Sequence, residues 1–187
     1  GAMVGFALTS PTHSVSTLWP PNAILLAALL LTPKRAWWIV LLGVFPAHLA
    51  VQLGSGVPVL MILSWFVSNA SEALIGAFCV RYFIDGPLRF DSIRDIGVFT
   101  IFAVIFSPFV TSFLDAGFVV LNGWRQDDFW QVWRMRFPAN ALVALTLVPA
   151  IILWIRNGVA WLRRASLQRY LEVSLLTSGL LIVSFLV

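Results

Sequence analysis

Long apolar stretches separated by short polar segments run through the whole chain. A helix needs about 20 apolar residues to cross the roughly 30 Å hydrocarbon core, and most of the complete stretches approach that length. The pattern predicts an all-α fold, a polytopic transmembrane helical bundle with about seven visible helices, the first and last truncated, of an expected eight. Their predicted ranges are residues 1–8, 20–31, 36–53, 57–80, 96–121, 138–155 and 171–187.

Composition supports the membrane assignment. The 187 residues are 60% hydrophobic and only 11% charged, with a mean hydropathy of +0.93, whereas a soluble domain is nearer half apolar and a quarter charged. We interpret residues 1–187 as one integral-membrane sensory domain, incomplete at both ends. The lone Cys79 lies in an apolar run, and no Cys/His cluster indicates a metal site.

The net charge of +4 comes from basic residues that flank the apolar runs. Such flanking charges orient helices in a membrane, so we do not interpret them as a nucleic-acid site. Nine of them fall in the segments 32–35, 81–95 and 156–170, which share one side if the helices alternate. The other side has Arg125, Arg134 and Arg136. This asymmetry places the first set in the cytoplasm and predicts a multi-pass protein of the bacterial inner membrane, with an eighth helix returning the chain to the cytoplasm.

Aromatic residues recur at helical spacing just before the sixth predicted helix, and they are Phe129, Trp130, Trp133 and Phe137. This spacing favours an amphipathic segment lying in the membrane interface on the outer side. Stacking of these rings on a ligand is the alternative interpretation.

The second apolar stretch is too short to span a bilayer, because 12 helical residues extend about 18 Å. Its helix begins within the segment Trp19, Pro20, Pro21 and Asn22, so this segment would lie at membrane depth with irregular or barely helical backbone. Such backbone is tolerated only inside protein or beside a wet cavity, and a helix start offers free amide donors. The segment is therefore a first candidate binding site.

Ionisable residues inside the predicted spans give the second set of candidates, because such groups are expensive in hydrocarbon. Glu72 shares a helix face with Ser68 and Asn69, and Asp115 shares one with Thr111. Pro108 lies one turn before Thr111 on that face. This proline frees the carbonyl of residue 104 and is expected to kink its helix. A carboxylate at the depth of Glu72 must be protonated, paired or solvated. A functional role is favoured for Glu72. For Asp115, a functional role and a structural position near the outer edge of the bundle are equally supported.

Two further polar residues complete the candidate set. His48 lies mid-helix, one turn before Gln52, and Asn140 is expected to open the sixth helix beside Pro138. Structural hydrogen bonding between helices explains Asn69, Gln52 and Asn140 as well as a ligand does, and it explains a lone His48 better. The predicted ligand-binding residues are Trp19, Pro20, Pro21, Asn22, His48, Asn69, Glu72, Asp115 and Asn140.

With these residues in view, the chain resembles the first class of MASE-type membrane-associated sensor domains. The likeness is carried by the Trp-Pro-Pro helix opening at residues 18–24, by the Asn-x-x-Glu-Ala…Gly helix at 69–77 with Arg81 after it, and by Trp133 with the late helix at 140–150, where Pro149 breaks the apolar run. The resemblance implies about eight helices in front of a histidine kinase or diguanylate cyclase, without defining a ligand.

The leading hypothesis is a non-catalytic sensory input domain without a cofactor, which binds a small ligand or senses membrane state and regulates a C-terminal output domain. Its partners would be the lipid bilayer, an unknown small ligand and that output domain, through which it would form a homodimer. A broken helix, midplane carboxylates and proline-kinked spans also describe small-solute carriers. A third hypothesis is an intramembrane enzyme that uses Glu72 and His48 as an acid–base pair.

Overall fold

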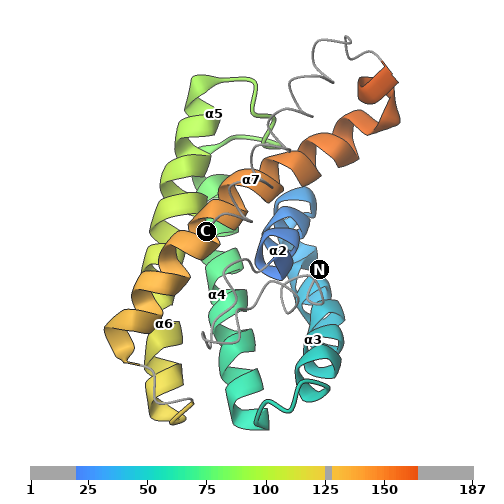
Figure 1. The fold of residues 1–187 in the computed structure, drawn as a ribbon. Helices are drawn as coiled ribbons and strands as arrows, with labels where there is room; N and C mark the ends of the chain where they lie inside the picture. The colour runs from blue at the N-terminus through green and yellow to red at the C-terminus, as the bar shows by residue number, and fades with distance from the viewer. Residues whose placement is uncertain (1–19, 125–127, 164–187) are drawn as a thin grey trace. The chain divides into compact units, whose positions relative to one another are not determined.

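A computed structural model describes residues 20–124 and 128–163 (Figure 1). The chain divides into two compact units, Gly1–Ile152 and Leu153–Val187. Within the described ranges the secondary structure is helical and contains no strand, which confirms the all-α prediction. The described elements are α2 (Pro20–Leu31), η1 (Lys34–Ala36), α3 (Trp37–Leu53), α4 (Val59–Phe83), α5 (Ile93–Val98), η2 (Phe99–Phe106), α6 (Ser107–Leu121) and α7 (Phe129–Arg163).

Four helical stretches are long and apolar enough to cross a membrane, and they are Lys34–Leu53, Val59–Phe83, Ile93–Leu121 and Phe129–Arg156. The predicted helices at residues 1–8 and 171–187 lie outside the described residues, so the count of seven is not confirmed. The chain is a membrane protein by the length and composition of these helices.

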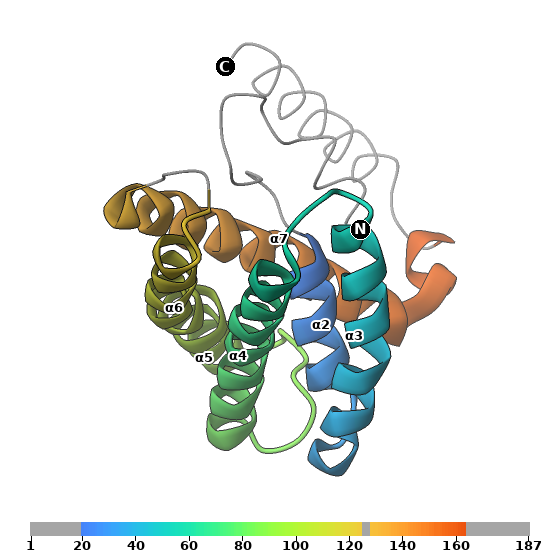
Figure 2. The same ribbon diagram turned by 90° about the horizontal axis from the view of Figure 1, so that it is seen from below.

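The short helix α2 lies between α3 and α4 in the larger unit (Figure 2). Its length of 12 residues agrees with the sequence prediction at both ends. Eight of its 12 residues are buried by neighbouring helices, whereas Ile24 is exposed. Its buried apolar residues are Ala23, Leu25, Leu26, Ala27, Leu29 and Leu30.

Helix α4 packs against α2 on one side and against η2 and α6 on the other. Gly76 permits the close approach, since a Cβ atom there would lie 3.4 Å from the Cα of Ala103 in η2 and 3.4 Å from the Cδ1 of Leu26 in α2. Three elements therefore converge on this glycine, one turn beyond Glu72.

The fifth predicted helix is continuous from Ile93 to Leu121, but its middle part is unusual. Residues Phe99–Phe106 form a π-helix, in which the N–H of Ser107 bonds to the carbonyl of Phe102, five residues back. Pro108 accounts for this register, because it lacks the N–H that the carbonyl of residue 104 would take in an α-helix. The freed carbonyl was anticipated from the sequence, whereas the π-helix was not.

Helix α7 corrects two sequence expectations. It begins at Phe129 and continues through Pro138, so residues 129–137 are not a separate interfacial segment and Asn140 does not open a helix. Prolines are tolerated inside membrane helices because neighbouring groups satisfy the freed backbone. The rings of Trp133 and Phe137 pack on Phe109 of α6, with centroids 5.4 and 5.7 Å away, so they build a helix–helix contact.

The described part of the second unit is the end of α7. Trp154, Ile155 and Arg156 are exposed there. The helix is interrupted at Gly158, whose φ of 57° and ψ of −165° are not helical and are readily adopted only by glycine.

Candidate functional site

Glu72 lies near the midpoint of α4, a helix long enough to cross the membrane. Its side chain is buried, with 6% of the residue exposed. A carboxyl group at this depth needs hydrogen-bond partners, because hydrocarbon provides none. Glu72 obtains these partners from side chains rather than from solvent.

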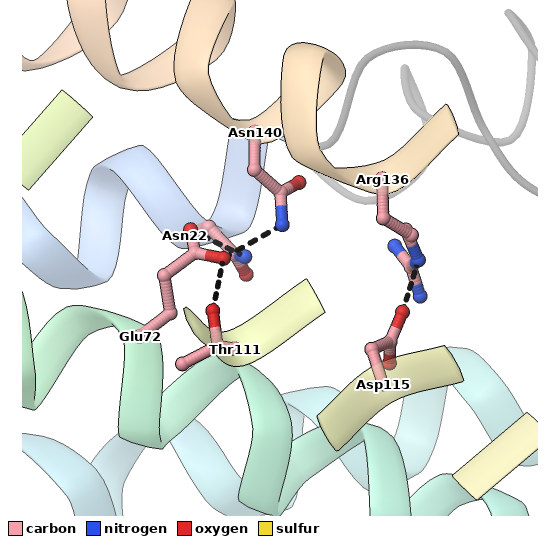
Figure 3. A network of polar contacts seen from close by, with 6 residues as sticks. All are labelled: Asn22, Glu72, Thr111, Asp115, Arg136 and Asn140. Atoms are coloured by element: carbon pink, nitrogen blue, oxygen red, sulfur yellow. Dashed lines mark hydrogen bonds and ion pairs between the residues drawn. The ribbon is translucent and has the colours of Figure 1, made fainter. Parts of the chain in front are cut away.

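Three side chains from three other helices reach the Glu72 carboxylate (Figure 3). Asn22 of α2 donates its Nδ2 to Oε1 at 3.2 Å. Thr111 of α6 and Asn140 of α7 lie against Oε2, with Oγ1 at 3.1 Å and Nδ2 at 2.7 Å. We call these four residues the Glu72 cluster. One carboxylate thus joins four helices that are distant in the sequence.

The first turn of α6 also holds the backbone of Glu72. The Ser107 hydroxyl donates to the Glu72 carbonyl oxygen, and Thr111 follows one turn later. The Thr111 hydroxyl has a single proton but two acceptors in reach, the Ser107 carbonyl oxygen at 2.9 Å and the Glu72 carboxylate. The hydroxyl can therefore donate to only one of them at a time.

Helix α2 contacts α4 near both of its own ends. Its first turn meets the middle of α4 through Asn22, and its C-terminal carbonyls meet the end of α4 through Arg81. The Arg81 guanidinium donates to the carbonyl oxygens of Leu30 at 2.8 Å and Thr32 at 2.7 Å. Helix α2 therefore runs alongside only the second half of α4, as expected for a helix too short to span the bilayer.

A second polar centre lies beside the Glu72 cluster (Figure 3). Arg136 of α7 forms an ion pair with Asp115 of α6, and both residues are buried, with 6% and 4% exposed. The guanidinium carbon lies 5.8 Å from the centre of the Trp65 ring. Arg136 is one turn before Asn140, so the two centres share neighbouring turns of α7.

Comparison with known families agrees with this architecture, because residues 1–187 match the MASE1 family over their full length. The chain belongs to the MASE1 family. MASE1 domains are membrane-associated sensory input domains and are not themselves catalytic. No curated protein and no solved structure matches this chain.

In this MASE1 domain, several residues selected from the sequence come together and others do not. Asn22, Glu72 and Asn140 share one cluster, and Pro20 and Pro21 form the start of α2 directly before Asn22. Asn69 is buried one turn before Glu72 but makes no hydrogen bond to it among the described residues. Trp19 lies outside the described residues.

His48 belongs to a different part of the MASE1 domain. Its Nε2 lies 3.1 Å from the carbonyl oxygen of Ile62, and its ring lies beside that of Phe66. Ile62 and Glu72 are ten positions apart in one helix, which is about 15 Å. The hypothesis that His48 and Glu72 act as an acid–base pair is therefore wrong, because the two side chains are too far apart to exchange a proton directly.

The buried position of Arg136 was not predicted from the sequence, in which this residue was assigned to the outer side of the membrane. The signal that could have found it is its spacing of four from Asn140, which puts both residues on one helix face. Thr111 was noted only as a neighbour of Asp115, and its contact with Glu72 was not foreseen.

Metal ligands of the His, Cys, Asp and Glu type do not gather in groups of three or more anywhere in the residues that the structure describes. The Glu72 cluster instead combines one carboxylate with amide and hydroxyl groups. Such a set can recognise a small polar or charged partner.

Proposed function

We propose that this MASE1 domain is the sensory input of a bacterial inner-membrane signalling protein, and that the Glu72 cluster is its sensing site. The observation that carries the proposal is the convergence of α2, α6 and α7 on the Glu72 carboxylate in the middle of α4. A small ligand or a change of membrane state that alters this carboxylate changes the contacts of four helices at once.

The proposed mechanism is a shift between two packing arrangements of these helices. A ligand shifts such an equilibrium only to the extent that it binds one arrangement better than the other. In the described arrangement Asn22, Thr111 and Asn140 all contact Glu72. A ligand that competes for the carboxylate would release these side chains and favour a second arrangement.

The signal would pass to a cytoplasmic output domain, a histidine kinase or a diguanylate cyclase, that follows the MASE1 domain in the full-length protein. The lipid bilayer and a small ligand would be its other partners, and homodimerisation would occur through the output domain. No cofactor is part of the proposal.

The test compares the output of the full-length protein in cells with that of Glu72→Gln across a panel of growth media. Gln keeps the size of the side chain and can still hydrogen-bond, but it has no charge. We expect Glu72→Gln to fix the output at one level, while the protein remains inserted and monodisperse in detergent. Thr146→Val is the matched control, because Thr146 is exposed and its hydroxyl bonds within its own helix. A normal response from Glu72→Gln would refute the proposal.

A small-solute carrier is the alternative function, and the half-length helix α2 favours it, since broken helices with ends near the midplane form substrate sites in carriers. Solute uptake into proteoliposomes containing the purified protein separates the two functions. A sensory domain gives no uptake above that of empty liposomes.

A further inference from the structure

Two cationic side chains lie at one end of the larger unit, where α3 starts and α4 ends (Figure 1). They are Lys34 and Arg35 of η1, and both are exposed. Among the residues that the structure describes, neither forms an ion pair, although the exposed Asp85 follows α4 at the same end. The two positive charges are therefore available to an anion from outside the chain.

Lys34 lies over an aromatic ring of the neighbouring helix. Its Nζ is 5.1 Å from the centre of the Phe78 ring in α4, and this ring is exposed. An exposed apolar side chain on a membrane-crossing helix faces lipid. Phe78 is five residues before the last residue of α4, about 8 Å along the axis, which is near the boundary between lipid headgroups and acyl chains. The ammonium group is thus held at the level where lipid phosphates lie.

Further exposed aromatic residues continue this surface on both helices. Trp38 is four positions after Lys34 and Tyr82 is four positions after Phe78, so each shares a helix face with the residue before it. Trp and Tyr favour the membrane interface, because their rings are apolar and their N–H and O–H groups are polar. We call Lys34, Arg35, Trp38, Phe78 and Tyr82 the Lys34 surface.

The backbone that carries the two cations is held in place without the use of their side chains. The indole Nε1 of Trp37, which follows η1, donates to the Leu29 carbonyl oxygen of α2 at 2.8 Å. Arg81 of α4 donates to the Thr32 carbonyl oxygen at 2.7 Å. The turn between α2 and α3 is therefore fixed on both sides, and the Lys34 surface is formed before any ligand arrives.

We infer that the Lys34 surface binds one anionic phospholipid. The phosphate lies between Lys34 and Arg35, and an acyl chain lies along the rings of Trp38 and Phe78. A zwitterionic lipid brings a cation of its own beside the phosphate, so an anionic headgroup complements the two positive charges better. This inference goes beyond the proposed function, because the surface lies at the end of α4 whereas the Glu72 cluster is near its midpoint.

The test is native mass spectrometry of the full chain in detergent, titrated with phosphatidylglycerol, phosphatidylcholine or inorganic phosphate. We expect saturable retention of one phosphatidylglycerol per chain, at least about tenfold weaker retention of phosphatidylcholine and no retention of phosphate. Each basic residue near an anionic headgroup contributes about fivefold, so the double variant Lys34→Gln/Arg35→Gln should weaken phosphatidylglycerol binding by about 30-fold.

The matched control is Arg89→Gln/Arg94→Gln, which removes the same charge from two exposed positions in the segment after α4. It should change the affinity by less than about twofold. Phe78→Leu keeps an apolar side chain but removes the ring under Lys34, and it should weaken binding by about two- to fivefold. Tryptophan fluorescence on heating checks that each variant is folded.

Three results would overturn the inference. Equal retention of the two lipids would show that the headgroup charge is not recognised. Equal losses in the two double variants would show that lipid is attracted by overall charge rather than by the Lys34 surface. Retention of inorganic phosphate in place of lipid would assign the surface to a soluble anion.

Discussion

The amide of Asn140 in α7 donates a hydrogen bond of 2.7 Å to the carboxylate of Glu72 in α4, although 68 positions separate the two residues. Both residues are buried. The bond fixes the turn of α7 that faces the middle of α4, and the next turn back brings Arg136 to Asp115. Two polar contacts on successive turns thus set how the first part of α7 packs on the bundle.

We expect Asn140→Leu to lower the free energy of unfolding by about 1 to 3 kcal/mol, because it keeps the branching of the side chain but removes a donor from a buried carboxylate. Unfolding in mixed detergent, followed by tryptophan fluorescence, measures this change. Thr146→Val on the same helix is the control and should change stability by less than about 0.5 kcal/mol. Equal stabilities of the two variants would mean that the bond to Glu72 contributes little.

The ion pair between Asp115 and Arg136 predicts strong non-additivity. Either Asp115→Asn or Arg136→Gln leaves one buried charge without its partner, at a cost of about 3 to 5 kcal/mol. The double variant removes both charges and should recover most of that loss. Unfolding of the four proteins forms a double-mutant cycle, and additive effects would show that the two side chains do not stabilise one another.

The main features of the site follow from the sequence because each depends on a local rule. Glu72 interrupts an apolar run, and a carboxyl group in hydrocarbon requires partners. The prolines at 20 and 21 and the polar segment after Leu31 bound a helix too short to span, so its start had to lie at membrane depth. Together these rules selected Asn22 and Glu72 as candidates, whereas their hydrogen bond of 3.2 Å depends on how α2 packs against α4.

The remaining features depend on packing between helices, which local rules do not specify. Arg136 resembled an outer-loop charge because Pro138 suggested a helix start, yet α7 continues through that proline and buries Arg136 against Asp115. The π-helix before Pro108 likewise reflects how one chain satisfies its backbone after a donor is lost. His48 could not be placed by spacing alone, and its contact is with Ile62.

Gly76 should tolerate alanine but not leucine. A Cβ atom there would lie in ordinary contact with Ala103 and Leu26, and alanine also favours a helix by up to about 1 kcal/mol. The longer side chain of leucine would enter the space that α2 and η2 occupy, which typically costs about 1 to 3 kcal/mol.

The unfolding midpoints of Gly76→Ala and Gly76→Leu in detergent test whether only the leucine variant is destabilised. Gly43→Leu is the matched control, because nothing lies within 4 Å of a Cβ atom at Gly43 in α3. If Gly76→Leu were as stable as Gly43→Leu, the close approach of α2, α4 and η2 would be wrong.

The orientation in the membrane gives the last prediction. Because Arg136 is buried in an ion pair, the basic residues of the outer side reduce to Arg125 and Arg134. The asymmetry of charge is then stronger, and it predicts that the loop between α4 and α5 is cytoplasmic. In a Cys79→Ala background, Asp85→Cys should react with a membrane-impermeant maleimide only in inverted vesicles, and Ser55→Cys only in intact spheroplasts. Both positions are exposed at opposite ends of α4, so each serves as the control for the other. Labelling of Asp85→Cys from the outside would show that the orientation is the reverse of the predicted one. The proposed cytoplasmic output domain would then have to lie on the side of Ser55.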